Sequence, residues 1–134
     1  MPGIGKDGAV IHPHVREAID SGLTCDITTT GRSSGESRRI EIWYFVVDGD
    51  VYITGTPGPR HWLANVRANP RMTFHVKEGA HADLPASAVE ITDLAERRRI
   101  MHRIRQAMSW YEEQGHSLDE WETSSPLIRV DLDP

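Results

Sequence analysis

The chain has 134 residues, enough for one domain with a single sizeable core, and we expect one domain over residues 1–134 with residues 1–10 frayed. Its 38% hydrophobic and 26% charged content is ordinary for a soluble globular protein, and its net charge of -5 argues against a general nucleic-acid binder. The absence of an apolar run near the roughly 18 to 20 residues of a membrane span, of a secretory signal and of a second cysteine favours a cytoplasmic protein without a membrane span.

The first third of the chain predicts a helix followed by two strands. Residues 13–21 predict a short helix that stops at Gly22, and residues 23–30 are β-branched and predict a strand. Residues 31–35 have the composition of a loop. Residues 38–47 alternate with apolar side chains on both faces, which predicts a central strand covered on both sides.

The middle of the chain predicts a hairpin, a helix and a further strand. Asp-Gly-Asp at 48–50 is a turn signal, and residues 51–55 predict the returning strand. Residues 60–68 predict a helix, because apolar side chains recur on one face and Asn-Pro follows. Residues 71–77 alternate as a strand.

The last third predicts a strand, a long helix, a helical turn and a closing strand. The strand lies within residues 82–92, and Pro85 places it near a sheet edge. An Asp N-cap begins a helix predicted over residues 94–113. Residues 117–122 predict one helical turn, and residues 126–132 predict the final strand. Strands joined by short turns indicate a mainly β fold, an antiparallel sheet or barrel of about six strands with two or three helices.

Several familiar chemistries find no support in the sequence. The motif Gly3-x-Gly5-x-x-Gly8 matches a dinucleotide fingerprint but has no strand before it and no helix after it. The seven histidines lack the spacing of a metal-binding helix, so we expect no metal site. Cys25 lies within a predicted strand, which favours a buried structural thiol over a nucleophile.

Positive charge is concentrated in the middle of this acidic chain. Between Thr28 and Lys77 there are seven basic and four acidic residues, so this stretch is net +3 while the rest is net -8. The segment after the first strand combines glycines, serines and arginines: Gly31, Arg32, Ser33, Ser34, Gly35, Arg38 and Arg39. Backbone N–H groups of a Gly-rich turn and guanidinium groups both bind phosphate oxygens.

A second segment with anion-binding character spans residues 55–60, where a Gly- and Pro-rich stretch opens the predicted helix and ends in Arg60. Two such segments at strand ends fit one elongated phosphorylated ligand. The alternative from the residues alone is two ordinary loops with exposed arginines.

The order of motifs over about residues 23–131 resembles the deazaflavin-dependent nitroreductases, a family with an FMN-binding-like split barrel. The resemblance rests on Thr-Thr-x-Gly-Arg at 28–32, Asp-Gly at 48–49, Trp-x-x-Asn at 62–65 and Ala-Asn-Pro at 68–70. It implies an antiparallel split β-barrel and the cofactor F-420, a deazaflavin with a phosphorylated acidic tail. Ser33 stands where many members have Lys, and the loop at 56–59 is short, so FMN stays an alternative cofactor.

The resemblance also implies roles for particular residues. The acidic tail would be held by Arg32, Ser33, Ser34 and Arg38. The ring would lie near Gly55, Thr56, Pro57 and Gly58. The phosphate end would be covered by Arg60, Trp62, Asn65 and Arg67.

The expected activity is hydride transfer from reduced F-420 to a small organic acceptor such as a quinone, a nitro compound or an activated double bond. Because the cofactor supplies the chemistry, we expect no catalytic nucleophile. Candidates for the acceptor pocket are Trp43, Tyr44, Trp110 and Tyr111, although Trp43 and Tyr44 also suit a plain core. The alternatives are an FMN-dependent oxidoreductase and a split barrel that binds flavin, deazaflavin or haem without turnover. A homodimer is compatible with the apolar strand at 38–47.

Overall fold

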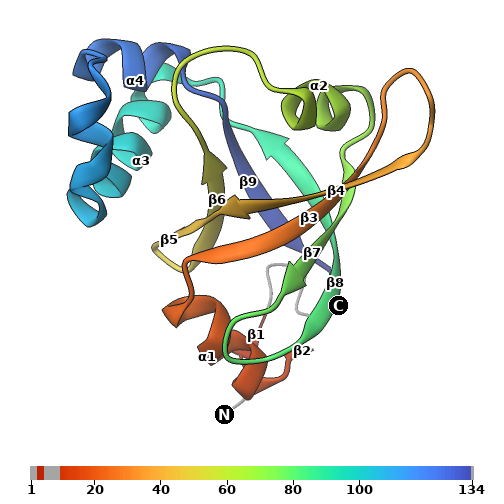
Figure 1. Ribbon diagram of the computed structural model, residues 1–134. Coiled ribbons are helices and arrows are strands. Elements are labelled where there is room, and N and C mark those ends of the chain that lie inside the picture. Colours follow the sequence, from red (N-terminus) through yellow and green to blue (C-terminus); the bar gives the residue numbers. More distant parts are fainter. Residues whose placement is uncertain (1–2, 5–9, 134) are drawn as a thin grey trace.

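The computed structural model describes residues 3–4 and 10–133, and its centre is a curled seven-stranded sheet in which every neighbouring pair is antiparallel (Figure 1). The strand order is β4-β3-β7-β8-β9-β6-β5. The strands of this sheet are β3 (Thr24–Thr30), β4 (Ser37–Trp43), β5 (Phe45–Val47), β6 (Asp50–Thr54), β7 (Arg71–Val76), β8 (Ala82–Glu90) and β9 (Leu127–Leu132). The helices are α1 (Pro13–Ser21), α2 (His61–Ala68), α3 (Leu94–Ala107), the 3-10 helix η1 (Ser109–Gln114) and α4 (Leu118–Ser124). This architecture confirms the predicted split-barrel-like, strand-dominated fold.

The predicted central strand over residues 38–47 is wrong, because the chain bends at Tyr44 and supplies both edges of the sheet. β4 ends one side of the strand order and β5 ends the other, although only one residue separates them. The Tyr44 amide donates to the Leu23 carbonyl at 3.0 Å, which holds the bend against the start of β3. Two consecutive segments can occupy opposite edges only if the sheet curls, so this bend accounts for the half-barrel shape. As an edge strand, β4 leaves Ile40 and Trp43 each 38% exposed.

The local signals at the hairpin and the first helix are confirmed. Asp48 and Gly49 have φ angles of 51° and 82°, the positive values that a tight two-residue hairpin turn requires. Helix α1 spans the predicted residues with Pro13 in its first turn and Gly22 as its C-cap. At the N-terminus, β1 (Gly3–Ile4) pairs with β2 (Val10–Ile11), and the rest of the predicted frayed segment lies outside the described residues.

The prediction that Pro85 places its strand at a sheet edge is also wrong, since β8 lies between β7 and β9. The β9 partners of β8 begin at Ala86, one residue after Pro85. Proline is therefore tolerated inside β8 because the ladder with β9 begins only after it, at Ala86.

The third helix is shorter than predicted from its apolar repeat. Helix α3 begins after the N-cap Asp93, as expected, but ends at Ala107, where Met108 takes an extended conformation with φ -147° and ψ 100°. The 3-10 helix η1 follows and stops at Gly115, whose φ is 77°. The continuous helix over residues 94–113 is thus two helices with a break between them.

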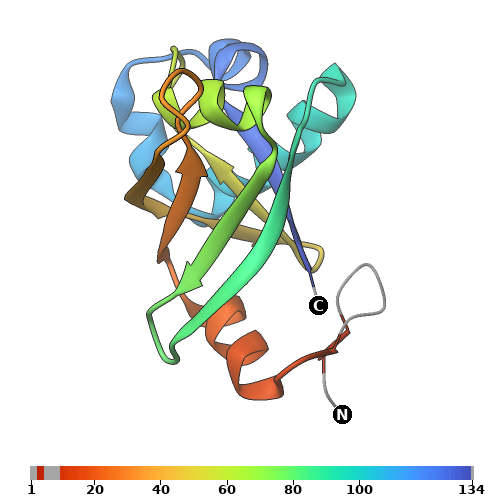
Figure 2. The ribbon, with the colours of Figure 1, turned by 90° about the vertical axis from the view of Figure 1, so that its right-hand side faces the viewer.

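The core has two parts, and neighbouring residues of strand β6 point into different parts, Val51 and Ile53 into the larger and Tyr52 into the smaller. The larger part joins the strands to α1 and α2, and the smaller part packs α3 and α4 against β5, β6 and β9. Figures 1 and 2 place α1 at one end of the sheet and α2 at the other, with α3 and α4 beside α2. In the part of the chain that the structure describes, no helix is long and apolar enough to cross a membrane.

Candidate functional site

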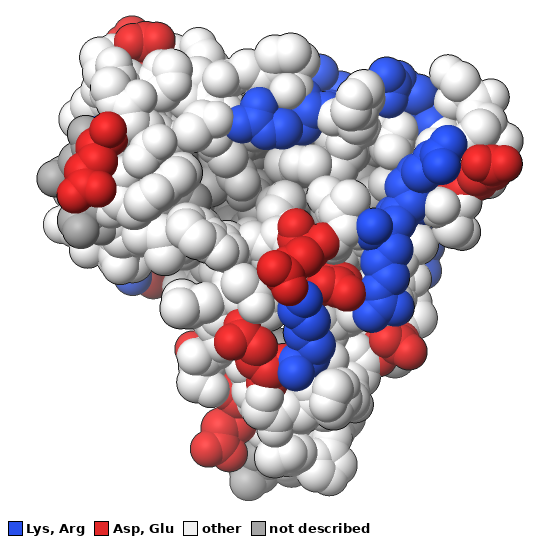
Figure 3. Space-filling model, viewed as in Figure 1, with Lys and Arg blue, Asp and Glu red and all other residues white. Residues whose placement is uncertain are grey.

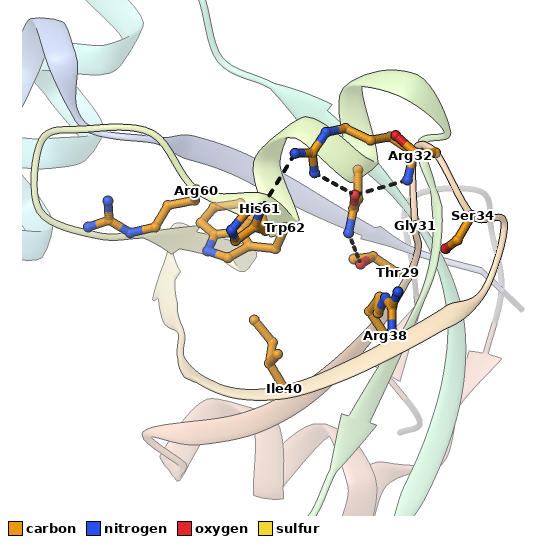
Figure 4. Close-up of a pocket in the computed structure, with 11 residues that line it drawn as sticks. Thr29, Gly31, Arg32, Ser34, Arg38, Ile40, Arg60, His61 and Trp62 are labelled. Atoms are coloured by element: carbon orange, nitrogen blue, oxygen red, sulfur yellow. Dashed lines mark hydrogen bonds between the residues drawn. The ribbon is translucent and has the colours of Figure 1, made fainter.

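The candidate site is a cavity of about 590 Å³ between the β3–β4 loop, strand β4 and the N-terminal end of helix α2 (Figure 4). Its volume is within the range of ordinary small-molecule sites. The described residues that line it are Thr29, Gly31, Arg32, Ser33, Ser34, Arg38, Ile40, Arg60, His61, Trp62 and Asn65. The sheet edge supplies one wall and the helix supplies the other.

The β3–β4 loop is closed by its own backbone. The Gly31 amide donates to the Glu36 carbonyl at 2.7 Å, and the Gly35 amide donates to the Gly31 carbonyl at 2.9 Å. A Cβ at Gly31 would lie 2.6 Å from Oγ of Ser34 and 3.3 Å from the Glu36 carbonyl oxygen, so a larger residue there would force the Ser34 side chain to move. Gly35 has a φ of 71°, which also favours glycine. The loop therefore presents its serines and arginines in a fixed turn.

Asn65 ties the loop to helix α2. Its Nδ2 donates to Oγ1 of Thr29 at 3.1 Å, and its Oδ1 accepts from the backbone N of Arg32 at 3.1 Å. The same Oδ1 accepts from Nη1 of Arg32 at 3.3 Å. Asn65 is 4% exposed and Thr29 is 3% exposed, so these bonds replace the water that both polar groups lose on folding. Asn65 thus orients Arg32 as well as joining the two walls.

Three arginines line the cavity, Arg32, Arg38 and Arg60, and none of the described lining residues is acidic. Arg60 donates from Nη2 to the Thr56 carbonyl at 2.9 Å, and Arg38 forms an ion pair with the loop residue Glu36 at 3.3 Å. Figure 3 shows Lys and Arg atoms gathered over α2 and β4 beside a hollow in the surface. The arrangement is that of an anion-binding cavity with an apolar wall formed by Ile40 and Trp62.

Seven of the predicted cofactor-binding residues line this cavity: Arg32, Ser33, Ser34, Arg38, Arg60, Trp62 and Asn65. The structure does not bring the others to its walls. Gly55, Thr56 and Pro57 lie outside the lining, where the Thr56 carbonyl accepts from Arg60. Gly58 and Arg67 line a separate depression of about 400 Å³, and Arg67 donates to both carboxylate oxygens of Glu90, at 2.9 and 2.6 Å.

The predicted acceptor-pocket aromatics separate into two groups. Trp43 and Trp110 form an edge-to-face pair with centroids 5.3 Å apart, and they are 38% and 39% exposed. Tyr44 is a core residue, 3% exposed, whose hydroxyl donates to the Ile19 carbonyl at 2.7 Å, and burial raises its pKa to about 12. Tyr44 therefore takes the plain core position that the sequence left as its alternative, and its place in an acceptor pocket stays a prediction. The side chain of Tyr111 lies outside the described part of the structure.

Sequence reasoning missed four residues that line the cavity: Thr29, Gly31, Ile40 and His61. Thr29 belongs to the motif at 28–32 but was assigned no contact with a ligand, and Gly31 was named only as part of the anion-binding segment, without a place in the cofactor site. Ile40 was assigned to a covered strand, and only its edge position exposes it. His61 had a local signal, since it follows Arg60 at the first position of helix α2.

Cys25 takes no part in the site. It is completely buried, and desolvation raises the pKa of its thiol to about 12, with the Asp26 carboxylate adding to the shift. At neutral pH such a thiol is protonated and unreactive, in agreement with the predicted buried structural role.

The comparisons with known proteins agree with this geometry. Residues 18–121 match the family described as "F-420H(2)-dependent quinone reductase". Among solved structures, an F-420-H2-dependent reductase is 23% identical, covering 81% of this chain and 93% of its own, with a TM-score of 0.60. An FAD-binding protein from Mesorhizobium loti is 15% identical, with 88% and 86% covered and a TM-score of 0.66. No curated protein matches the chain.

One further structural relative is described as a domain-swapped dimer. It is 22% identical, covers 81% of this chain and 79% of its own, and has a TM-score of 0.60. At these identities the solved structures establish a shared fold, while the family match extends over most of the chain.

Proposed function

Because the chain belongs to the family of F-420H(2)-dependent quinone reductases, we propose that it passes a hydride from reduced F-420 to a small organic acceptor. The acceptor classes that we propose are a quinone, a nitro compound or an activated double bond. The observation that carries this proposal is the cavity whose described walls hold three guanidinium groups and no carboxylate.

The donor set fits the charge of the implied cofactor. The tail of F-420 carries a phosphate and carboxylates, and Arg32, Arg38 and Arg60 offer guanidinium groups for such oxygens. Ser33 and Ser34 add hydroxyl donors from the glycine-bounded loop. We assign these five residues to the anionic part of the cofactor and the apolar surfaces of Ile40 and Trp62 to its less polar part.

The chain's own contribution is binding and orientation. When bound, the deazaflavin supplies a hydride, which is chemistry that no side chain provides. Asn65 fixes Arg32 before any ligand arrives, so little side-chain freedom is left to lose on binding. Holding two reactants at reacting distance can supply about 7 kcal/mol or more of the barrier, and we therefore assign no catalytic nucleophile.

For the acceptor we propose the exposed pair of Trp43 and Trp110 as an apolar contact surface. The two indoles come from the end of β4 and from η1, and both keep more than a third of their surface exposed. A planar acceptor offers its flat face to such rings. Replacing Trp110 with Ala is expected to raise the KM for a quinone without changing the Kd for F-420.

The cofactor assignment is tested by titrating the protein with F-420 and with FMN, each followed by fluorescence. FMN also carries a tricyclic ring and a phosphate, so tighter binding of FMN would favour the alternative cofactor. Turnover is tested by mixing the protein with reduced F-420 and a benzoquinone or nitroarene and following reoxidation. Tight F-420 binding without acceptor-dependent reoxidation would identify a binding protein and contradict the proposed enzyme.

Strand β4 offers a matched pair of variants for the binding test. Arg38 lines the cavity, whereas its neighbour Arg39 points to the opposite face of the strand and donates to Asp26 at 3.0 Å. Arg38→Ala is expected to weaken F-420 binding about tenfold or more, the cost of one charge-assisted contact. Arg39→Ala is expected to change the affinity for F-420 by less than about twofold. An equal loss of affinity in both variants would contradict the assigned site.

Strand β4 is also an exposed sheet edge, and its outward residues include the half-exposed Trp43. We propose a homodimer as the oligomeric state, and sedimentation of the purified protein tests it. A single monomeric species at all concentrations would contradict it.

A further inference from the structure

His61 is a titratable residue in the candidate cavity to which the proposed function assigns no role. It is the first residue of helix α2, its side chain is exposed, and it lines the cavity. Its Nδ1 lies 3.5 Å from Nη2 of Arg32 (Figure 4). A guanidinium can only donate, so Nδ1 accepts this bond through its lone pair, which requires a neutral imidazole in this arrangement.

The charged neighbours of His61 in the cavity are cations. Arg32 comes from the β3–β4 loop, Arg38 from strand β4 and Arg60 from the residue before helix α2. The loop carboxylate Glu36 is paired with Arg38. A proton on His61 would therefore add a positive charge to a cavity that is already lined by three arginines.

A multiply charged anion in the cavity would offset this positive charge. Its oxygens attract the arginines and would attract a protonated imidazole in the same way. We propose that His61 takes up a proton when a ligand with two or more negative charges binds, and that it then acts as a fourth cationic contact. The identity of that ligand as F-420 rests on the proposed function, whereas the response to anionic charge does not.

This coupling has a defined consequence for affinity. If binding takes up a proton, the affinity must rise as the pH falls through the range in which imidazole titrates. His61 is exposed, so it exchanges this proton directly with solvent. Of the described residues lining the cavity, only His61 has a side chain that ordinarily titrates near neutral pH.

The test compares F-420 affinity at about pH 6 and about pH 8 for the unaltered protein, His61→Asn and His102→Asn. His102 is an exposed histidine on α3 outside the cavity lining, so it controls for the loss of a titrating surface group. For each protein, the affinity at the lower pH is divided by the affinity at the higher pH. The ionisation of F-420 itself is common to all three proteins and cancels when these affinity ratios are compared. We expect the affinity ratio of His61→Asn to be smaller than that of the unaltered protein by about threefold to tenfold, the effect of one added charge near the surface.

A second readout uses inorganic pyrophosphate and no cofactor. The imidazole resonances of the full-length protein are followed by NMR over the same pH range, with and without pyrophosphate, and His61 is assigned by the loss of its signal in His61→Asn. We expect His61 to be protonated at a higher pH when pyrophosphate is present, while His102 is unchanged.

The two readouts separate failure of this inference from failure of the proposed function. A His61 response to pyrophosphate in a protein that does not bind F-420 would contradict the proposed cofactor and support the inference. An unchanged pH ratio in His61→Asn, together with no response of His61 to pyrophosphate, would overturn the inference whatever the cofactor. His61→Gln repeats both tests with a longer neutral side chain if His61→Asn fails to fold.

Discussion

Nδ2 of Asn65 on helix α2 donates a hydrogen bond to Oγ1 of Thr29 on strand β3 at 3.1 Å, joining residues that are 36 positions apart. Both side chains are almost completely buried, and the other end of the Asn65 amide accepts two bonds from Arg32. One side chain thus supports the fold and positions a cavity residue at the same time.

Asn65→Leu is therefore expected to reduce both stability and ligand affinity. The substitution keeps the approximate volume but leaves the Thr29 hydroxyl without its donor and the Arg32 amide without its acceptor, which costs about 1 to 3 kcal/mol. Urea unfolding measures the stability, and fluorescence titration with F-420 measures the affinity. Asn69→Ala is the control, because Asn69 is only half-buried and bonds the Arg71 amide away from the cavity; equal effects would contradict the special role of Asn65.

Glu36→Gln is expected to strengthen binding of an anionic ligand. Glu36 pairs with Arg38 at 3.3 Å, so a ligand must compete with this carboxylate for the guanidinium. Removing the charge should increase F-420 affinity by about twofold to fivefold, the size of an exposed ion pair. The matched control is Glu41→Gln on the opposite face of β4, where Glu41 pairs with Lys77. Weaker binding in Glu36→Gln would show that this carboxylate does not compete with the ligand.

Tyr44→Phe is expected to lower stability without changing turnover. The hydroxyl donates to the Ile19 carbonyl at 2.7 Å, and its loss leaves that buried acceptor short of a partner, at a cost of about 1 kcal/mol. Thermal unfolding measures this loss, and reoxidation of reduced F-420 measures turnover. A large fall in kcat with unchanged stability would instead show that Tyr44 takes part in the reaction.

The ion pairs of Asp26 predict a pH-dependent contribution to stability. Hydrogen bonds from Lys77 and Arg39 hold the pKa of this carboxyl below its usual value of 3.8. A depressed folded-state pKa contributes stability that is fully present above the unfolded value and is lost as pH falls through the folded value.

Asp26→Asn should therefore destabilise the protein at pH 7 and have little effect at about pH 2 to 3, below the ordinary carboxyl range. Urea unfolding at both pH values measures the difference. Asp20→Asn, which removes an exposed partner of Arg16, serves as the control and should give a smaller change at pH 7. If the free energy of unfolding differed between the unaltered protein and Asp26→Asn by the same amount at both pH values, the ion pairs of Asp26 would be ruled out as the source of the difference.

The amino-acid sequence by itself determined the local structure of this protein. The Asp48-Gly49 turn, the Asp93 N-cap and the Gly22 stop of helix α1 depend on the backbone preferences of neighbouring residues, and all three occur as predicted. The motif at 28–32 likewise identified one wall of the cavity and the family, because its residues are contiguous.

Only the tertiary structure decided which surfaces those elements cover. Alternation along residues 38–47 shows that both faces are apolar, but it carries no information about which strands lie on either side. The bend at Tyr44 sends one half to each sheet edge, exposes Ile40 to the cavity and buries Tyr44 itself. Contacts such as Asn65 with Thr29 depend on how a helix crosses a curled sheet, a relationship between distant segments that no local pattern encodes.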